Sequence, residues 1–371
     1  MAEEIPFVPP EKTFAVVMAG GKGERFWPLS RAARPKQLLA LTGGKPLVAE
    51  AVERLRGLVP EENIVIVTNA ALVAPIREIL GEGSRVGVVG EPVGRDTATA
   101  VAAGAAWCAR RDPDGVMCVL TADHLIGDLD VFRATLRGAM AFAAAEDALL
   151  TIGIAPREPA TGYGYIHRGG ESRPLPGGGG EICKVERFVE KPGREVAERY
   201  LAEGGYFWNS GMFVWGLRTL ERAMARHCPE KAACLARWKE AADDAAYGGM
   251  LERDYPGLEK ISVDYALMEK ADNVWVVPGA FSWDDVGSFP ALAAHLPDDG
   301  AGNAVLGAVE AIGSAGNVVL SEGRLTALVG VEDLVVVQAD GVTLVARKDR
   351  AEEIKKLLAQ LRGKGGYEKW F

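Results

Sequence analysis

The sequence predicts an α/β fold with a mainly parallel β-sheet, because apolar strands alternate with helical patterns and a glycine-rich loop follows the first strand. Residues 14–18 form a short, continuous apolar run, as expected of a buried parallel strand. Strand-like runs then alternate with helical patterns: strands at 64–68, 85–89 and 116–120, and helices at 46–58, 70–80 and 97–111. In such a sheet, ligands bind beyond the carboxyl ends of the strands.

The loop after the first strand has the composition of a phosphate-binding segment. It contains Ala19, Gly20, Gly21, Lys22, Gly23 and Arg25, and a second basic segment with Lys36 follows at 35–37. The glycines lack a Cβ, so successive N–H groups can point at an anion, and the three basic side chains add positive charge. The spacing matches neither a Walker A loop nor a dinucleotide-binding fingerprint. A plain turn with solvated charges is the alternative, and the second basic segment argues against it.

Length and composition describe an ordinary globular protein. With 371 residues, 48% of them hydrophobic, the chain is large enough for two domains, which we place at 1–296 and 297–371. The net charge of −9 argues against a nucleic-acid partner. The start of the chain lacks a signal pattern, and five scattered cysteines indicate neither disulfides nor a zinc site. Since no apolar stretch approaches the roughly 20 residues that span a bilayer, we expect a cytoplasmic protein without a membrane partner.

The middle and the end of the chain depart from this alternation. A glycine-rich tip at 177–180 between strand-like runs predicts an inserted, partly antiparallel lobe over the nucleotide half, with a second ligand between them. Beyond 297, short Val/Leu runs broken by turn residues fit either coils of a small parallel β-helix or a compact sandwich, and their regular spacing favours the coils. An amphipathic helix at 349–361 must cover an apolar surface, of this chain or of a second subunit in a homodimer.

Acidic residues at strand ends predict a magnesium site. Asp123 follows the strand at 116–120, and Asp285 lies in the segment 284–287. Magnesium keeps several waters and takes one or two carboxylates together with phosphate oxygens, so these two residues are sufficient beside a triphosphate. A cap or turn role is the alternative for each aspartate alone.

Two further segments fit a sugar phosphate. Glu190 and Lys191 end a strand just before a proline, where the bend lets neighbouring side chains reach one ligand. Lys191 suits the phosphate and Glu190 suits ring hydroxyls, with a surface ion pair as the alternative. Asn209 precedes a strand, and its amide both donates and accepts hydrogen bonds, as sugar hydroxyls require. A simple turn is the competing explanation for Asn209.

Taken in order, these motifs resemble the sugar-phosphate nucleotidylyltransferases, and among them the mannose-1-phosphate guanylyltransferase family. The resemblance runs from about residue 14 to 290 through the segments 19–25, 35–37, 91–98, 121–124, 162–166, 188–192, 208–213, 261–270 and 281–287. It implies a Rossmann-like nucleotidyltransferase domain with a short C-terminal left-handed β-helix. It also implies synthesis of GDP-mannose and pyrophosphate from GTP and mannose 1-phosphate, with Mg²⁺. Longer relatives carry an isomerase domain that would begin beyond residue 371, so we expect a single activity.

The resemblance also assigns roles to residues. It implies that the nucleotide binds Ala19, Gly20, Gly21, Lys22, Gly23, Arg25 and Lys36 together with Glu91, Gly94, Thr97 and Asp123. It implies that Asp123 and Asp285 hold the metal. The catalytic residues that it implies are Arg25, Lys36, Asp123 and Asp285. For the sugar phosphate it implies Gly162, Tyr163, Glu190, Lys191, Asn209 and Asp285. Asp96 stands where many relatives are expected to have asparagine, so the side-chain role in that segment is open.

The choice of base and the kind of activity leave alternatives. Guanine presents donors, so its pocket needs acceptors, either the Glu91 carboxylate or backbone carbonyls near Gly94. Another base or sugar on the same architecture is the nearest rival function. A catalytically silent sensor of nucleotide sugars is the rival of a different class, although the expected lysines and aspartates are all present.

Overall fold

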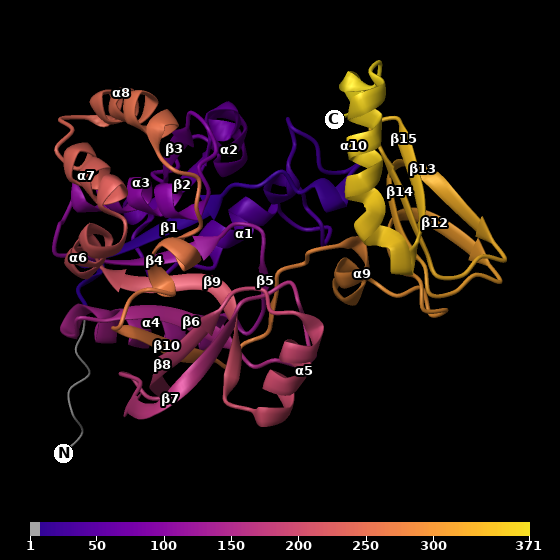
Figure 1. The fold of residues 1–371 in the computed structure, drawn as a ribbon. Coiled ribbons are helices and arrows are strands. Elements are labelled where there is room, and N and C mark those ends of the chain that lie inside the picture. The colour runs from indigo at the N-terminus through magenta and orange to yellow at the C-terminus, as the bar shows by residue number, and fades with distance from the viewer. Residues whose placement is uncertain (1–7) are drawn as a thin grey trace. The chain divides into compact units, whose positions relative to one another are not determined.

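The computed structural model describes residues 8–371, which divide into two compact units (Figure 1). The first unit contains residues up to 20, 51–122 and 126–283, and the second contains 21–50, 123–125 and 284–371. The chain passes from one unit to the other within helix α1 (Leu47–Glu53) and within the short paired strands β5 (Leu125–Ile126) and β11 (Trp283–Asp284). Each unit contains several separate segments of the chain, whereas the expected domains are two continuous segments that meet at 296. The boundary at 296 therefore stays a prediction.

The first unit is built on a nine-stranded mixed sheet with the order β3-β2-β1-β4-β9-β6-β10-β8-β7. Strands β3, β2, β1 and β4 run parallel, which confirms the parallel sheet expected from the apolar runs. The strands are β1 (Thr13–Ala19), β2 (Ile64–Asn69), β3 (Gly87–Glu91), β4 (Val116–Thr121), β6 (Leu149–Ile154), β7 (Tyr165–Pro174), β8 (Glu181–Val189), β9 (Tyr206–Gly216) and β10 (Val274–Gly279).

Helices cover this sheet closely. Nearly every residue of β1, β2, β4 and β6 is buried, as in a sheet with both faces covered. A Cβ at Gly104 of α3 would lie 2.4 Å from the Val16 side chain of β1, so glycine allows the helix to approach the strand. The helices are α2 (Val73–Leu80), α3 (Thr97–Ala109), α4 (Leu129–Ala145), α5 (Arg194–Glu203), α6 (Leu217–His227), α7 (Pro229–Trp238) and α8 (Asp244–Asp254).

The middle of the chain is partly antiparallel, as expected, but the expectation that it forms a lobe over the nucleotide half is wrong. Strand β9 lies antiparallel between β4 and β6 and also pairs with β7, so the middle of the chain extends the same sheet. The physical reason is the length of β9, because 11 residues are enough to pair with central strands at one end and with the β7–β8 hairpin at the other. The place of the second ligand, which was expected between two lobes, stays a prediction.

The second unit contains a β-helix-like sheet with the order β12-β13-β14-β15. Its strands are β12 (Ala304–Ile312), β13 (Val318–Val329), β14 (Leu334–Ala339) and β15 (Val342–Arg347), and the first three run parallel. Asn303 and Asn317 are fully buried at successive turns, where Nδ2 of Asn317 donates to Oδ1 of Asn303 at 2.8 Å. This stacking of coils through buried turn asparagines confirms the β-helix rather than the sandwich.

The phosphate-loop segment and the β-helix share one hydrophobic core. That core, called here the shared core, contains Phe26, Trp27, Leu29 and Leu39 from the segment 21–50, Val318, Leu320, Val335 and Val337 from the β-helix, and Ile354 and Leu358 from helix α10 (Ile354–Lys364). Helix α10 follows the 3₁₀ segment η9 (Lys348–Glu353). The amphipathic helix therefore covers an apolar surface of its own chain, which is one of the two alternatives that its sequence left open.

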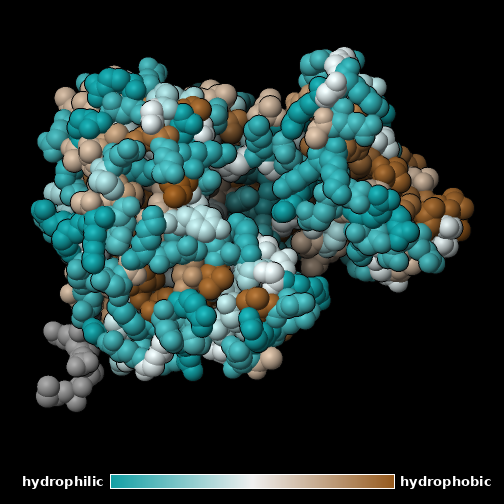
Figure 2. All heavy atoms as spheres, in the orientation of Figure 1, coloured by the Kyte–Doolittle hydropathy of each residue, from teal (hydrophilic) through white to brown (hydrophobic). Residues whose placement is uncertain are grey.

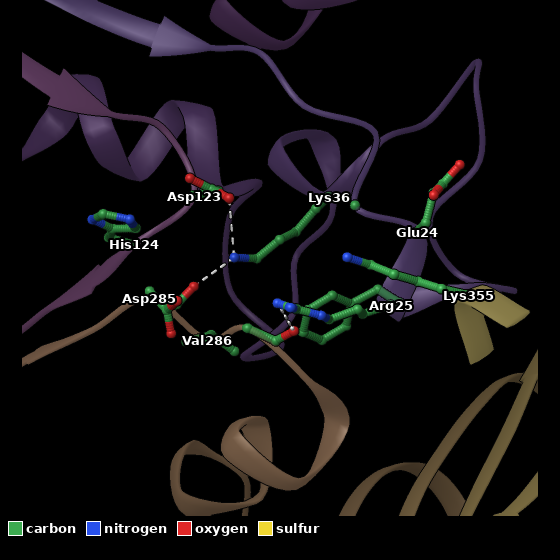
Figure 3. A pocket seen from close by; sticks show the side chains of 11 residues that line it. Glu24, Arg25, Lys36, Asp123, His124, Asp285, Val286 and Lys355 are labelled. Atoms are coloured by element: carbon green, nitrogen blue, oxygen red, sulfur yellow. Dashed lines mark hydrogen bonds and ion pairs between the residues drawn. The ribbon is translucent and has the colours of Figure 1, made fainter. Parts of the chain in front are cut away.

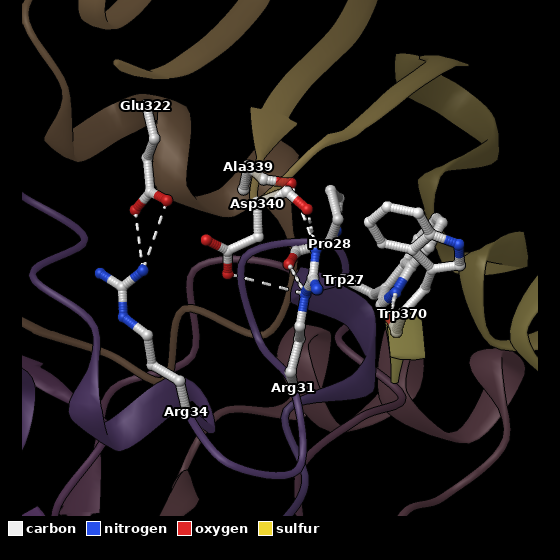
Figure 4. Close-up of polar contacts among 8 residues, drawn as sticks. All are labelled: Trp27, Pro28, Arg31, Arg34, Glu322, Ala339, Asp340 and Trp370. Atoms are coloured by element: carbon white, nitrogen blue, oxygen red, sulfur yellow. Dashed lines mark hydrogen bonds and ion pairs between the residues drawn. The ribbon is translucent and has the colours of Figure 1, made fainter. Parts of the chain in front are cut away.

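The end of the chain docks onto the same segment (Figure 4). The indole Nε1 of Trp27 donates to the backbone oxygen of Trp370 at 2.7 Å, and Nη2 of Arg31 donates to the backbone oxygen of Ala339 at 3.2 Å. These contacts attach the segment 27–31 to the C-terminal part of its unit.

Apolar side chains also reach the surface of the β-helix (Figure 2). Ile312, Leu325, Val329 and Val345 are 60% to 75% exposed and all lie on its strands. Clustered apolar residues of this kind are typical of an interaction surface. Within residues 8–371, every helix is too short or too polar to cross a lipid bilayer.

Candidate active site

One pocket of the second unit is lined by all four residues expected to be catalytic (Figure 3). Arg25, Lys36, Asp123 and Asp285 come from three segments far apart in the sequence, yet they surround the same space. The remaining lining residues are Gly23, Glu24, Phe26, His124, Val286, Gly287 and Lys355. Basic and acidic side chains of this kind around one cavity can hold a polyphosphate together with a cation.

Lys36 lies at the centre of this pocket. Its side chain is only 6% exposed, and its Nζ donates to Oδ2 of Asp123 at 3.1 Å and to the backbone oxygen of Asp285 at 2.7 Å. Gly23 makes this packing possible, because a Cβ there would lie 2.7 Å from the Lys36 Cβ and 2.6 Å from Oγ of Ser30. Gly23 also has φ +57°, in the left-handed region that favours glycine.

Asp123 is held in its ionised form. Burial acts to raise the pKa of its carboxyl group, but the charge of Lys36, the neighbouring His124 and the hydrogen bond from Lys36 together lower the pKa below its usual range. The side chain is still 32% exposed. An ionised carboxylate with access to the pocket is the state that a metal ligand requires.

Arg25 has two partners and remains open to solvent. Its Nη1 donates to the backbone oxygen of Gly287 at 3.4 Å, and its Nε lies 2.8 Å from Oε2 of Glu352 in an ion pair. The side chain is 39% exposed. A planar guanidinium placed in this way can bind phosphate oxygens with two N–H groups at once.

The chain passes from the first unit to the second within the loop. Ala19 ends β1, Gly20 belongs to the first unit, and Gly21 and Lys22 are exposed in the second. Gly21 has φ +99°, and a Cβ there would meet nothing within 4 Å. Packing inside the chain therefore leaves space beside the loop.

The segment expected to bind the nucleotide base lies in the first unit. Glu91 ends β3, is buried, and accepts a hydrogen bond from the Tyr255 hydroxyl. Burial raises the pKa of Glu91, with a further contribution from the charge of Asp96, while the Tyr255 bond opposes the shift. A Cβ at Gly94 would meet nothing within 4 Å, which leaves its backbone open to a ligand.

Thr97 and Asp96 have structural partners in the same segment. Oγ1 of Thr97 accepts a hydrogen bond from the Val263 N–H at 2.8 Å, which fixes the segment 261–263 beside the start of α3. Asp96 has φ +66°, and its Oδ1 accepts from the Thr97 N–H at 2.8 Å as the N-cap of α3. The Asp96 side chain therefore begins the helix, in the capping role that short acidic residues often have.

Glu190 and Lys191 meet where β8 ends. Nζ of Lys191 lies 2.6 Å from Oε1 of Glu190, and Lys191 has φ +46°, so the chain bends there as the following proline led us to expect. The side chain of Glu190 is 9% exposed and that of Lys191 is 61% exposed. A Cβ at Gly164 would lie 2.4 Å from Oε2 of Glu190, so glycine makes room for this carboxylate.

Asn209 lies within β9 and not ahead of a strand as expected, and it has less free hydrogen-bonding capacity than the sequence suggested. Its Oδ1 accepts from the Thr151 hydroxyl and from the Gly211 N–H, each at 3.2 Å, and its Nδ2 donates to Oδ1 of Asp264 at 2.8 Å. An amide has two acceptor positions and two N–H donors, so one N–H remains for a ligand. Asn209 can therefore donate to a sugar hydroxyl but is poorly placed to accept from one.

Gly162 and Tyr163, which were also expected at the sugar, are adjacent in the sequence. Gly162 is exposed, and a Cβ there would meet nothing within 4 Å. The Tyr163 ring packs against Trp208 and Trp283, with ring centroids 5.0 and 5.4 Å apart. These aromatic contacts fix the position of the segment beside Asn209.

Two residues of these sites, Asp264 and Lys355, were assigned no role from the sequence. Asp264 orients Asn209, and burial together with the charge of Glu190 raises the pKa of Asp264 to about 6. A lone aspartate within the apolar run 261–268 was the available signal. Lys355 of α10 lines the pocket of Lys36, and its position in an amphipathic helix gave no indication of this.

The fold and this pocket together define an α/β nucleotide-processing enzyme that is continued by a β-helix. The family model described as nucleotidyl transferase matches residues 14–301, and one described as MannoseP isomerase/GMP-like beta-helix domain matches 307–361. A relative from Escherichia coli K12 named mannose-1-phosphate guanylyltransferase is 38% identical over 369 residues, covering 96% of this chain and 75% of that protein. A relative of the same name from Klebsiella pneumoniae is 39% identical over 353 residues, covering 94% of this chain and 73% of its own length.

A solved structure agrees with these matches. A crystal structure from Thermus thermophilus, described as mannose-1-phosphate geranyltransferase, is 38% identical with a TM-score of 0.85, covering 95% of this chain and 99% of that one. The chain belongs to the nucleotidyl transferase family, within its group of mannose-1-phosphate guanylyltransferases.

Proposed function

We propose that this protein converts GTP and mannose 1-phosphate to GDP-mannose and pyrophosphate. The observation that carries the proposal is the single pocket in which Arg25, Lys36, Asp123 and Asp285 face one another. The names of the relatives support mannose 1-phosphate as the acceptor and guanine as the base. The topology supports nucleotide binding at the loop and Asp123. These two follow the carboxyl ends of the adjacent parallel strands β1 and β4, where ligands bind in such sheets.

The proposed reaction is an in-line attack of a phosphate oxygen of mannose 1-phosphate on the α-phosphorus of GTP. A new phosphorus–oxygen bond forms, the bond from the α-phosphorus to the bridging oxygen breaks, and that oxygen leaves with its electron pair as part of pyrophosphate. The second pKa of a phosphate monoester is about 6, so the nucleophile is already mostly dianionic at neutral pH. The reaction therefore needs no residue to remove a proton, and His124 need not act as a base.

The main task of the site is to bring two polyanions together. Two like unit charges about 4 Å apart repel by about 4 kcal/mol at an effective dielectric constant of about 20. In our proposal Arg25 and Lys36 offset this repulsion at the triphosphate, and Lys191 does so at the sugar phosphate. Each of them also lowers the barrier where its contact strengthens as negative charge develops on the leaving pyrophosphate.

Asp123 and Asp285 would hold a magnesium ion, and their chemistry fits this role. Magnesium binds oxygen ligands, usually one or two carboxylates in addition to phosphate oxygens and water. Both aspartates line the pocket beside the loop, and the lowered pKa of Asp123 keeps that carboxylate charged. When bound, the ion would neutralise part of the phosphate charge.

In the first unit, the proposal assigns the sugar ring to Gly162, Tyr163, Glu190 and Asn209. The base is assigned to Glu91 or to the backbone near Gly94, and Thr97 acts through the segment 261–263 that it holds. A cytoplasmic location and a homodimer remain predictions.

A substrate matrix tests the proposal. The four common ribonucleoside triphosphates are each incubated with mannose 1-phosphate or glucose 1-phosphate, with magnesium or with a chelator, and pyrophosphate release is measured. We expect release with GTP, mannose 1-phosphate and magnesium, and strong loss on chelation. Faster release with another pair would assign the enzyme to a different member of the family, and absence of release with every pair would support the sensor function.

A further inference from the structure

The end of η9 and helix α10 together present one edge to the phosphate loop. Glu352, Lys355 and Arg362 are spaced by three and seven residues, which brings them to the same side of a helix. Glu352 pairs with Arg25, with 2.8 Å between Oε2 and Nε, and Arg362 pairs with Glu24, with 2.8 Å between Nη2 and Oε1. Lys355 lies between Glu352 and Arg362 in the sequence, and its side chain lines the pocket (Figure 3).

The orientation of this edge is fixed by the opposite side of the helix. Ile354 and Leu358, one helical turn apart, are 3% and 2% exposed and belong to the shared core. Helix α10 also packs against η2 (Glu24–Phe26) of the loop. Lys355 is thus held at the pocket by packing that does not depend on its own charge.

Lys355 differs from the other two cations of the pocket in its pairing. Lys36 lies 3.1 Å from the carboxylate of Asp123, and Arg25 is paired with Glu352. Among residues 8–371, the side chain of Lys355 makes neither a hydrogen bond nor an ion pair. An incoming anion can therefore reach the ammonium group of Lys355 without displacing a carboxylate from it.

We propose that Lys355 binds the terminal phosphates of the nucleoside triphosphate, and with them the leaving pyrophosphate. The inference rests on the proposed function and extends it, because it gives a helix of the C-terminal domain a direct part in the site. The choice of the triphosphate over the sugar phosphate follows from the neighbours of Lys355, since Gly23, Glu24 and Arg25 of the loop line the same pocket. An ammonium group is a compact point charge that suits phosphate oxygens.

Lys355 contributes when the bridging oxygen leaves the α-phosphorus. Negative charge then accumulates on the pyrophosphate, and a fixed ammonium group beside it stabilises that charge. The same contact should be visible in the reverse reaction, where pyrophosphate is a substrate. The KM for pyrophosphate therefore reports on Lys355 more directly than the forward rate does.

Lys355→Gln is the test variant, and Lys356→Gln is its matched control. Both lysines are exposed neighbours on one helix, but Lys356 is absent from the pocket lining. We expect Lys355→Gln to raise the KM for magnesium pyrophosphate about tenfold or more, as for loss of a charge-assisted hydrogen bond. The KM for GDP-mannose and for mannose 1-phosphate should change little. Lys356→Gln should match the wild type, and Lys355→Arg should recover most of the lost affinity.

Calorimetric titration of each variant with magnesium pyrophosphate supplies a second measurement, and circular dichroism checks that each variant is folded. Equal affinities of Lys355→Gln and Lys356→Gln for pyrophosphate would overturn the inference. A KM change confined to mannose 1-phosphate would also overturn it, since the lysine would then bind the other substrate. If the wild type released no pyrophosphate in the substrate matrix, the proposed function itself would fail.

Discussion

Replacing Lys36 by methionine should separate catalysis from stability at the centre of the pocket. Methionine keeps the length of the side chain but removes the ammonium group that contacts Asp123 and the Asp285 backbone. The group is almost fully buried, so solvent provides little screening for a phosphate beside it. A phosphate charge about 4 Å away interacts with it by about 4 kcal/mol at an effective dielectric constant of about 20.

Only the part of this interaction that is gained in the transition state affects turnover. Loss of one preorganised charge donor typically costs about 10²-fold in kcat, which corresponds to about 2.7 kcal/mol. We therefore expect Lys36→Met and Lys36→Ala to lose about 10²-fold or more in turnover, and Arg25→Ala a similar amount.

The same variant should change how stability depends on pH. Because Lys36 lowers the pKa of Asp123, the ionised carboxylate stabilises the fold above its unfolded pKa of about 3.9, and this contribution is lost as the pH falls through the lower folded pKa. Lys36→Met should therefore be destabilised by about 1–3 kcal/mol near neutral pH, with Asp123 partly exposed, and the difference should shrink below about pH 4.

The assays are pyrophosphate release and urea unfolding at several pH values. Lys12→Met is the control, because it removes an exposed lysine whose ion pair with Asp112 is 3.9 Å long. Unchanged turnover in both Lys36 variants and in Arg25→Ala would refute the proposed catalytic role. A pH-independent stability difference would refute the assigned coupling between Lys36 and Asp123.

Three further predictions follow from the two sites. Asp285→Asn should weaken magnesium activation at least about tenfold, and an unchanged magnesium dependence of the rate would show that a different carboxylate holds the ion. Glu91→Gln should reduce the preference for GTP over ATP, measured as a ratio of kcat/KM, whereas an intact preference would favour readout by the backbone. Asp264 has a pKa raised to about 6, so its protonated form stabilises the fold at low pH and this contribution is lost as the pH rises through 6. In urea unfolding, the free energy of unfolding of the wild type should fall between about pH 5 and pH 7.5. Asp264→Asn should make this fall smaller by about 1 kcal/mol, and an unaltered pH profile would contradict the assignment.

The parallel half of the sheet could be predicted because its signals are local. Apolar runs at 14–18, 64–68 and 116–120 mark strands that are buried on both faces. The loop and Asp123 directly follow two of these strands in the sequence. The bend at Glu190 and Lys191 was equally readable from the following proline.

The remainder depends on pairing between distant segments. The sequence predicts a strand that follows Asn209, but it shows neither that the strand begins at Tyr206 nor that it lies between β4 and β6. The prediction for Asn209 assumed that its amide was free to donate and to accept hydrogen bonds. Its hydrogen bonds to Thr151 and Asp264, which lie more than fifty residues away along the chain, reduce that capacity. Lys355 could not be assigned for the same reason, because only the packing of α10 brings it to the pocket.

The shared core has a consequence for where this enzyme can be divided. Phe26 and Trp27 of the loop are packed with Val318 and Val335 of the β-helix, although about three hundred residues separate them in the sequence. A fragment that stopped before the β-helix would keep Lys36, Asp123 and Asp285. It would expose the apolar side chains of the loop, including Phe26 and Trp27, whose packing fixes the geometry of the pocket. The C-terminal coils therefore support the phosphate loop through this packing, and a change in the coils at these positions alters the surface on which the loop lies.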